Sequence, residues 1–179
     1  MGIKQVKDGC WTFGDGEGGC YPWPVAENGG GNEWKKIADV TLEEDVTAIE
    51  ITKDINGGSI SCTELIYYFK SITYNTELTS GTTNESIIQW YNGTRISESL
   101  PFTIRAGTKN NPETYYSMGK YNSLTGEMYG ISSTANASGN LQTRNNSFPL
   151  NNKINTIKLG FSPVNRWWAI GTTLTIFGR

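Results

Sequence analysis

Short segments in which apolar and polar residues alternate recur from residue 34 to the end of this chain, and this pattern constrains the fold most strongly. Around residue 50, for example, Ile49 and Ile51 alternate with Glu50 and Thr52. An alternation of period two is typical of β-strands that bury one face. Nine such segments lie at residues 38–42, 49–51, 60–72, 87–91, 102–106, 115–121, 128–131, 157–161 and 173–176. The pattern therefore predicts a chain built from strands, with almost no helix.

Turn signals and one long apolar segment refine this prediction. Segment 60–72 carries apolar residues on both faces, which favours a central place in a covered sheet. Glycine and asparagine tolerate the positive φ of tight turns, and they recur between the segments. The clearest turn dipeptides are Asn56-Gly57, Asn92-Gly93 and Thr125-Gly126. We predict an all-β fold, an antiparallel β-sandwich or jelly roll, forming one domain over residues 34–179.

The first 33 residues have a different composition, rich in glycine and without strand-length alternation. We predict that residues 1–33 form an extended Gly-rich arm. Exposure of one large apolar side chain costs roughly 1.5–3 kcal/mol, so aromatic residues in such an arm require a covering surface. The candidate anchoring residues are Trp11, Phe13, Tyr21 and Trp23. They are expected to dock on a neighbouring subunit or another protein; the alternative is that the arm folds back over its own sandwich.

The charge balance disfavours nucleic acid as a partner. Fifteen basic and seventeen acidic residues give a formal net charge of -2, and no basic run is present. Nucleic-acid binding is driven by the counterions released when Lys and Arg side chains neutralise phosphates, and this sequence has no cluster of basic residues to do so. No apolar run reaches the length of a membrane span or of a signal-peptide core, so we expect no membrane partner and synthesis in the cytoplasm without a signal peptide.

The chain contains no histidine, which excludes Ser-His and Cys-His nucleophile pairs and histidine ligands for zinc. We therefore predict no enzyme activity, with no catalytic, cofactor-binding or metal-binding residue. The enzyme-class alternative is a glycosidase, which needs two carboxylates about 5–9 Å apart. Its candidates are Glu43, Glu44, Asp45, Glu77, Glu85, Glu98 and Glu127.

Three other features have a functional and a plain interpretation. Residues 14–19 match G-x-G-x-x-G, but prolines follow them and Asp15 and Glu17 would repel a phosphate, which favours a flexible arm over a nucleotide site. The acidic run 43–45 offers oxygen ligands to Ca²⁺, or is a polar turn. The cysteines, Cys10, Cys20 and Cys62, are expected to be reduced; a bridge between the first two is the alternative.

Adjacent aromatic pairs are the most suggestive feature for binding. Because side chains alternate between the faces of a strand, one member of each pair should face away from the core. Such residues can stack on sugar rings, contact another subunit, or pack in the outer layer of the sandwich. The candidate glycan or subunit contacts are Trp90, Tyr91, Tyr115, Tyr116, Trp167 and Trp168.

Two stretches resemble a known group of proteins. WKKIADVTLEEDVT at residues 34–47, continuing into IEITKDING at 49–57, resembles the opening of a domain in minor structural proteins of tailed phages and prophages of Gram-positive bacteria. The ending, INTIKLG at 154–160 and GTTLTIFGR at 171–179, is similar to the final strand pair of those proteins.

This resemblance implies a β-sandwich on the outside of a virion, as a tail-tip, fibre or head-decoration component. It also implies a homo-oligomer, for which a trimer is expected, with other virion proteins as partners and a cell-wall glycan as a further one. The closest alternative function is a carbohydrate-binding module of a bacterial surface protein.

Overall fold

The computed structural model describes residues 33–85, 87–97, 104–134, 140–144, 149–161 and 165–179, together with three short N-terminal strands. Every regular element in these parts is a β-strand, so the all-β prediction is confirmed. No helix of the described residues is long and apolar enough to cross a membrane.

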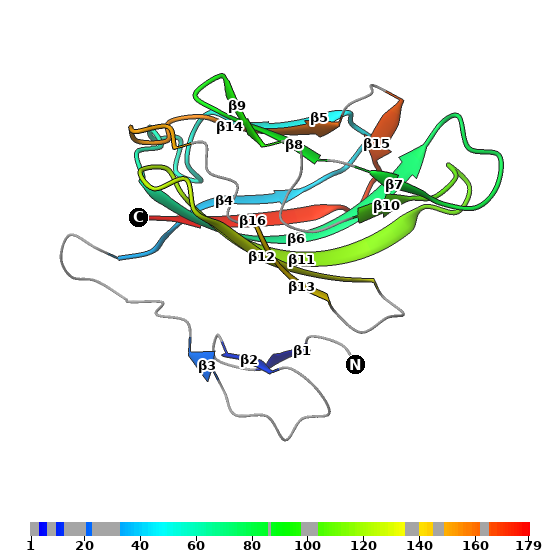
Figure 1. The fold of residues 1–179 in the computed structure, drawn as a ribbon, viewed down its shortest axis with the longest axis horizontal. Coiled ribbons are helices and arrows are strands. Elements are labelled where there is room, and N and C mark those ends of the chain that lie inside the picture. The colour runs from blue at the N-terminus through cyan, green and yellow to red at the C-terminus, as the bar shows by residue number, and fades with distance from the viewer. Residues whose placement is uncertain are drawn as a thin grey trace.

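Two antiparallel sheets make up most of the molecule (Figure 1). The larger sheet has the strand order β13 (Asn140–Arg144), β12 (Met128–Thr134), β11 (Glu113–Asn122), β6 (Glu64–Asn75), β16 (Thr173–Gly178) and β4 (Lys35–Thr41). A seventh strand, β15 (Arg166–Trp168), pairs with the end of β6. The smaller has the order β5 (Ala48–Ile51), β14 (Ile157–Phe161), β8 (Ile87–Tyr91), β9 (Thr94–Ser97). A separate pair joins β7 (Thr83–Glu85) to β10 (Ile104–Ala106).

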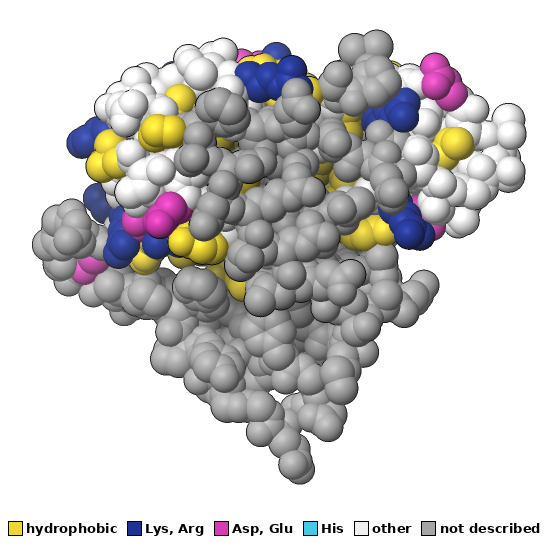
Figure 2. Space-filling view, viewed as in Figure 1, with side chains coloured by type: hydrophobic (Ala, Val, Ile, Leu, Met, Phe, Trp, Pro, Cys, Tyr) yellow, Lys and Arg dark blue, Asp and Glu magenta, His cyan; other side chains and the backbone are white. Residues whose placement is uncertain are grey.

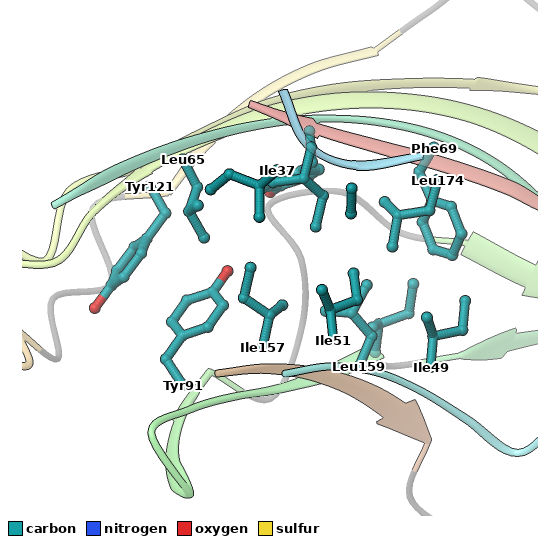
Figure 3. Packing of buried hydrophobic residues seen from close by; sticks show 14 of the residues in the cluster. Ile37, Ile49, Ile51, Leu65, Phe69, Tyr91, Tyr121, Ile157, Leu159 and Leu174 are labelled. Atoms are coloured by element: carbon teal, nitrogen blue, oxygen red, sulfur yellow. The ribbon is translucent and has the colours of Figure 1, made fainter. Parts of the chain in front are cut away.

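The sheets pack face to face, and one hydrophobic core lies between them. Figure 3 shows Leu65, Phe69 and Leu174 of the larger sheet facing the smaller one. Ile49, Ile157 and Leu159 point back at them from the smaller sheet. Alternate residues along each strand enter this core, as the period-two pattern predicts. The arrangement is that of a β-sandwich.

Strand β6 is the centre of the larger sheet. It pairs with β11 on one side and with β16 and β15 on the other. Leu65, Tyr67 and Phe69 point into the core, and Ile66 on the opposite face is also buried. The central position predicted for segment 60–72 is confirmed, although the strand begins four residues later and ends three residues later than that segment.

The predicted turn dipeptides lie at bends of the chain. Asn92 and Gly93 both have positive φ, at 53° and 75°, and connect β8 to β9. The side chain of Asn92 also ties this hairpin to the neighbouring loop: its Nδ2 donates to the Lys153 carbonyl at 2.7 Å and its Oδ1 accepts from the Asn155 amide at 2.7 Å. The hairpin at one end of the smaller sheet is thereby held by side-chain bonds as well as by pairing.

The N-terminal segment contains three short strands, β1 (Lys4–Val6), β2 (Cys10–Thr12) and β3 (Tyr21–Pro22). They form an antiparallel sheet in which Trp11 is directly opposite Tyr21. The sequence pattern does not reveal these strands, because each has only two or three residues. Phe13 and Trp23 lie outside the described residues, as do Cys20 and the glycine-rich motif at 14–19.

Candidate binding surfaces

The outward side of the larger sheet carries a band of aromatic and long aliphatic side chains, which we call the large outer face. It comprises Ile66 and Tyr68 of β6, Tyr116 and Met118 of β11, Tyr129 of β12 and Phe177 of β16. These residues have the strand parity opposite to the core residues. Figure 2 shows hydrophobic and charged side chains together along the lower margin of the described surface, the side on which Figure 1 places this sheet.

The register places these side chains in adjoining rows. Tyr129, Lys120, Ile66 and Phe177 lie opposite one another on four neighbouring strands. Met118 lies opposite Tyr68 in the next row. Neighbouring strands are about 4.8 Å apart, so each side chain can touch the next across the row. The row therefore spans four strands, with Lys120 between Tyr129 and Ile66.

Exposure divides the large outer face into a buried middle and an open rim. Ile66 is only 5% exposed, whereas Tyr116 and Tyr129 are each 41% exposed. In the middle, the rings of Tyr68 and Phe177 meet edge to face at 6.1 Å. Burial raises the pKa of Tyr68 to about 12. The rim thus offers two tyrosine rings to a partner.

One end of the large outer face is fixed by charged groups around Trp34. The Arg179 guanidinium lies 4.8 Å from the centre of the Trp34 ring, and Lys120 Nζ lies 5.8 Å from it. Glu64 accepts a hydrogen bond from Arg179 Nε at 2.5 Å and from Asn122 Nδ2 at 3.0 Å, and it pairs with Lys120 at 3.4 Å. Cations over an indole ring contribute about 0.5–1 kcal/mol each at such sites.

The Glu64 carboxyl shows how strongly this cluster is coupled. Burial opposes its ionisation, but the hydrogen bond from Arg179 and the positive charges of Lys120 and Arg179 outweigh burial. The pKa of Glu64 is therefore below its ordinary value. Since Trp34 immediately precedes β4, these contacts set the point at which the chain enters the sandwich.

The outward side of the smaller sheet, which we call the small outer face, is built around a single indole. Trp90 lies against Gly160, whose missing Cβ would come within 3.0 Å of the ring. Lys158 is opposite Trp90 in the register, with its Nζ 5.8 Å from the ring centre. Arg95 and Glu50 lie on the flanking strands of the same row. This surface combines one aromatic ring with charged neighbours.

Three of the six predicted aromatic contacts belong to the core instead. Tyr91, Tyr115 and Trp168 are buried. Trp168 is completely enclosed, with its ring 4.3 Å from that of Phe161. Tyr91 packs on Tyr121 at 4.9 Å. These three side chains cannot reach a glycan or a subunit from inside the core, so their assignment as outer contacts is wrong.

Their pair partners lie on the outer side, on different parts of the molecule. Tyr116 is on the large outer face and Trp90 on the small one. Trp167 is half-buried and stacks on Tyr74, with ring planes 4° apart and centres 6.4 Å apart. The alternation argument thus found one outward residue in each pair. It did not find Tyr129, Phe177 or Trp34, although Tyr129 and Phe177 show the same signal, an aromatic residue beside core residues of opposite parity.

Among the carboxylates considered for catalysis or Ca²⁺ binding, Asp45 has a structural role. Asp45 accepts a hydrogen bond from the Ile170 amide at 2.9 Å and from the Tyr74 hydroxyl at 2.7 Å. These bonds hold the pKa of Asp45 below its ordinary value. Among the described residues, no group of three or more Asp, Glu or Cys side chains is arranged to hold a metal ion. Glu98 lies outside the described residues.

In comparisons with known proteins, no family model, no curated protein and no solved structure matches the chain.

Proposed function

We propose that this chain is a non-enzymatic structural protein of a phage virion, a jelly-roll type sandwich that forms a homo-oligomer or binds other virion proteins through its large outer face. The observation that carries the proposal is the group of Tyr, Phe, Ile and Met side chains that spans four neighbouring strands of that face, with Lys120 among them. A tail-fibre or head-decoration position is the form that the sequence resemblance supports.

The composition of the band favours a protein partner. Protein interfaces are enriched in Tyr, Phe and Met at their centre, and charged residues are moved to the rim. Here Lys36 and Asp39, at the edge strand β4, pair with each other at 2.9 Å, beside the aromatic rows. Thr175 Oγ1 adds a hydrogen bond to Asp39 at 3.0 Å. These two charges are paired at the edge, and Lys120, which lies within the aromatic rows, is paired with Glu64 at 3.4 Å.

The test is a double variant, Tyr116→Asp with Tyr129→Asp, which places two charges on the exposed rim. We expect loss of oligomers in light scattering and loss of incorporation into particles. Ile55→Asp is the matched control, since Ile55 is 52% exposed in a turn outside the strands of both sheets. If the double variant assembles as the control does, the large outer face is not the assembly surface.

A second candidate function is carbohydrate binding at the small outer face. The observation that favours it is the Trp90 ring, held over Gly160 beside Lys158. An indole with polar neighbours can stack on a pyranose ring and hydrogen-bond its hydroxyls. Binding to purified cell walls should fall at least tenfold in Trp90→Ala and be unchanged in Trp167→Ala. Equal loss in both variants would remove this candidate.

A glycosidase is the enzyme-class alternative. A general acid in such an enzyme has a raised pKa. The described carboxyls with a displaced pKa are Asp39, Asp45 and Glu64, and all three are lowered, which supports the non-enzymatic proposal. Glycan hydrolysis that disappears when two carboxylates are changed would overturn it.

A further inference from the structure

We infer that Asn56, in the exposed turn that follows β5, is a site of spontaneous deamidation in the folded protein, whereas Asn92 is protected from the same reaction. Each of these asparagines precedes a glycine, Gly57 or Gly93. The turn at residues 52–59 lies outside the strands of both sheets, so the site is independent of the outer faces named in the proposed function.

The reaction needs only water and the groups that an Asn-Gly pair carries. The backbone nitrogen of the glycine attacks Cγ of the asparagine, the new C–N bond closes a succinimide ring, and the bond from Cγ to Nδ2 breaks. Nδ2 leaves as ammonia and takes the proton of the glycine nitrogen with it. A water molecule then opens the ring at either carbonyl and leaves aspartate or isoaspartate. Asparagine is therefore thermolabile, and a following glycine, which has no Cβ, obstructs the attack least.

The side-chain amide of Asn92 is held on every side. Its Nδ2 donates to Asn152 Oδ1 at 3.0 Å and to the Lys153 carbonyl at 2.7 Å. Its Oδ1 accepts from the Asn155 amide at 2.7 Å and from the Thr156 amide at 3.3 Å. These bonds use both donor hydrogens and both acceptor lone pairs of the side-chain amide. Attack on Cγ of Asn92 therefore requires this set of bonds to break first.

The surroundings of Asn56 are open instead. Residues 55–59 are all exposed, and among the described residues none forms a hydrogen bond with the side-chain amide of Asn56. Gly57 has a φ of 80°, and apart from its chain neighbours no atom lies within 4 Å of the position that a Cβ would take. The Asn56 side chain can therefore turn toward the Gly57 nitrogen with solvent around both groups.

The bonds of Asp54 restrain this turn only locally. Its Oδ1 accepts from the Asn56 amide at 2.9 Å and from the Gly58 amide at 2.8 Å. Its carbonyl accepts from the Gly57 amide at 3.0 Å, so the attacking nitrogen has to leave one exposed hydrogen bond. Opening of an exposed turn is a local event, whereas Asn92 is released only when its hairpin separates from the neighbouring loop. The folded protein thus separates the two sites by how much structure has to open.

Deamidation changes the turn in charge and in backbone length. A carboxylate at position 56 lies two residues from Asp54 and adds one negative charge to the formal -2 of the chain. In the isoaspartate form the main chain passes through the former side chain and gains a methylene group. The Asp54 carboxylate then cannot keep both of its amide donors, which are spaced for an ordinary backbone. The product is expected to have a more acidic and looser turn after β5.

The experiment follows both asparagines in one sample of the full chain. The folded protein, and the same protein unfolded in concentrated guanidinium chloride, are incubated in mildly alkaline buffer, and their peptides are analysed by mass spectrometry at intervals. The unfolded chain is the matched control, because it gives the rate of each Asn-Gly pair without structure. A third pair, Asn28-Gly29, lies outside the described residues and is measured in a separate peptide.

We expect Asn56 to deamidate at least tenfold faster than Asn92 in the folded chain, and the two rates to agree within about threefold in the unfolded chain. Aspartate and isoaspartate should both form at position 56. An Asn92 rate equal to that of Asn56 in the folded chain would overturn the inference, as would no reaction at Asn56 in the folded chain while both sites react in the unfolded one. A difference as large in the unfolded chain as in the folded one would assign it to local sequence and overturn the structural explanation.

Discussion

The two outer faces of the sandwich differ in how their aromatic residues are supported. On the large outer face, aromatic residues come from four strands, and the rings of Tyr68 and Phe177 on neighbouring strands meet edge to face at 6.1 Å. On the small outer face, Trp90 is the single indole of its row and lies on the backbone of Gly160. Side chains that support one another form a broad apolar surface, whereas an indole on a glycine forms a small platform with charged neighbours. The first suits a protein partner and the second a sugar ring.

In each sheet one aromatic ring lies over a glycine, and the two rings differ in how tightly they are enclosed. On the inward side of β11, a Cβ at Gly119 would come within 2.2 Å of the Tyr67 ring, and Tyr67 is buried in the core. At Gly160 the corresponding distance to Trp90 is 3.0 Å, and Trp90 is on the outer side. The first ring is enclosed by the opposite sheet, and the second can move toward solvent.

The largest predicted effect follows from that difference. Gly119→Ala should lower the free energy of unfolding by about 2–3 kcal/mol, because the Tyr67 ring has no space into which to shift. Gly160→Ala should cost less than about 1 kcal/mol, since the Trp90 ring can tilt outward. Urea unfolding at one pH measures both values. Equal losses of unfolding free energy in the two variants would show that the Tyr67 and Trp90 rings are equally restricted.

A second prediction concerns Trp90 itself. Trp90→Thr removes a half-buried indole from the small outer face and should lower the unfolding free energy by about 1–1.5 kcal/mol. Threonine keeps the strand propensity, so the loss reports the contact with Gly160 and Lys158. Lys158→Ala is the companion variant, and its loss should be under about 1 kcal/mol. A neutral result for Trp90→Thr would mean that the indole does not pack on the sheet.

A third prediction tests the charged end of the large outer face. The folded pKa of Glu64 is below its ordinary value of 4.5, so its ionised form stabilises the fold above that pH. This contribution disappears as the pH falls through the lower, folded pKa. Glu64→Gln should therefore lose about 1 kcal/mol at pH 7, a value discounted for solvent screening, and the difference from the parent protein should disappear as the pH falls through the folded pKa of Glu64.

The control for that prediction comes from the small outer face. Glu50 is exposed and lies opposite Lys158 only by strand register. Glu50→Gln should change the unfolding free energy by less than about 0.5 kcal/mol at any pH between 3 and 7. If both variants show the same pH profile, the cluster around Trp34 has no special electrostatic role.

The strands that sequence analysis could predict are those in which apolar and polar residues alternate. All nine predicted segments overlap strands of the two main sheets or of the short β7 and β10 pair. Strands β7, β9, β13 and β15 are not among the nine segments, because none of them contains two apolar residues separated by one polar residue. β15, with the sequence Arg-Trp-Trp, has no polar residue between its two tryptophans.

The binding surfaces were predictable only in part. Alternation requires one outward aromatic residue in each adjacent pair, and this holds for Trp90, Tyr116 and Trp167. Which member points outward depends on the register of the whole strand, and the sequence leaves that register open. The Trp34 cluster joins residues up to 145 positions apart, from residue 34 to residue 179, so no local pattern could indicate it.

The smallest predicted effect concerns the rim of the large outer face. Tyr116 is 41% exposed, and threonine, as a β-branched residue, suits a strand at this position. Tyr116→Thr should therefore change the unfolding free energy of the isolated chain by less than about 0.5 kcal/mol. The same variant should still weaken self-association measured by light scattering, since a ring at an interface contributes more than it does on a free surface. A loss of stability above about 1 kcal/mol would mean that Tyr116 already packs on its own chain and that the rim is closed. Unchanged stability together with unchanged association would leave the large outer face no more open to a partner than the small one, and the contrast between the two faces would disappear.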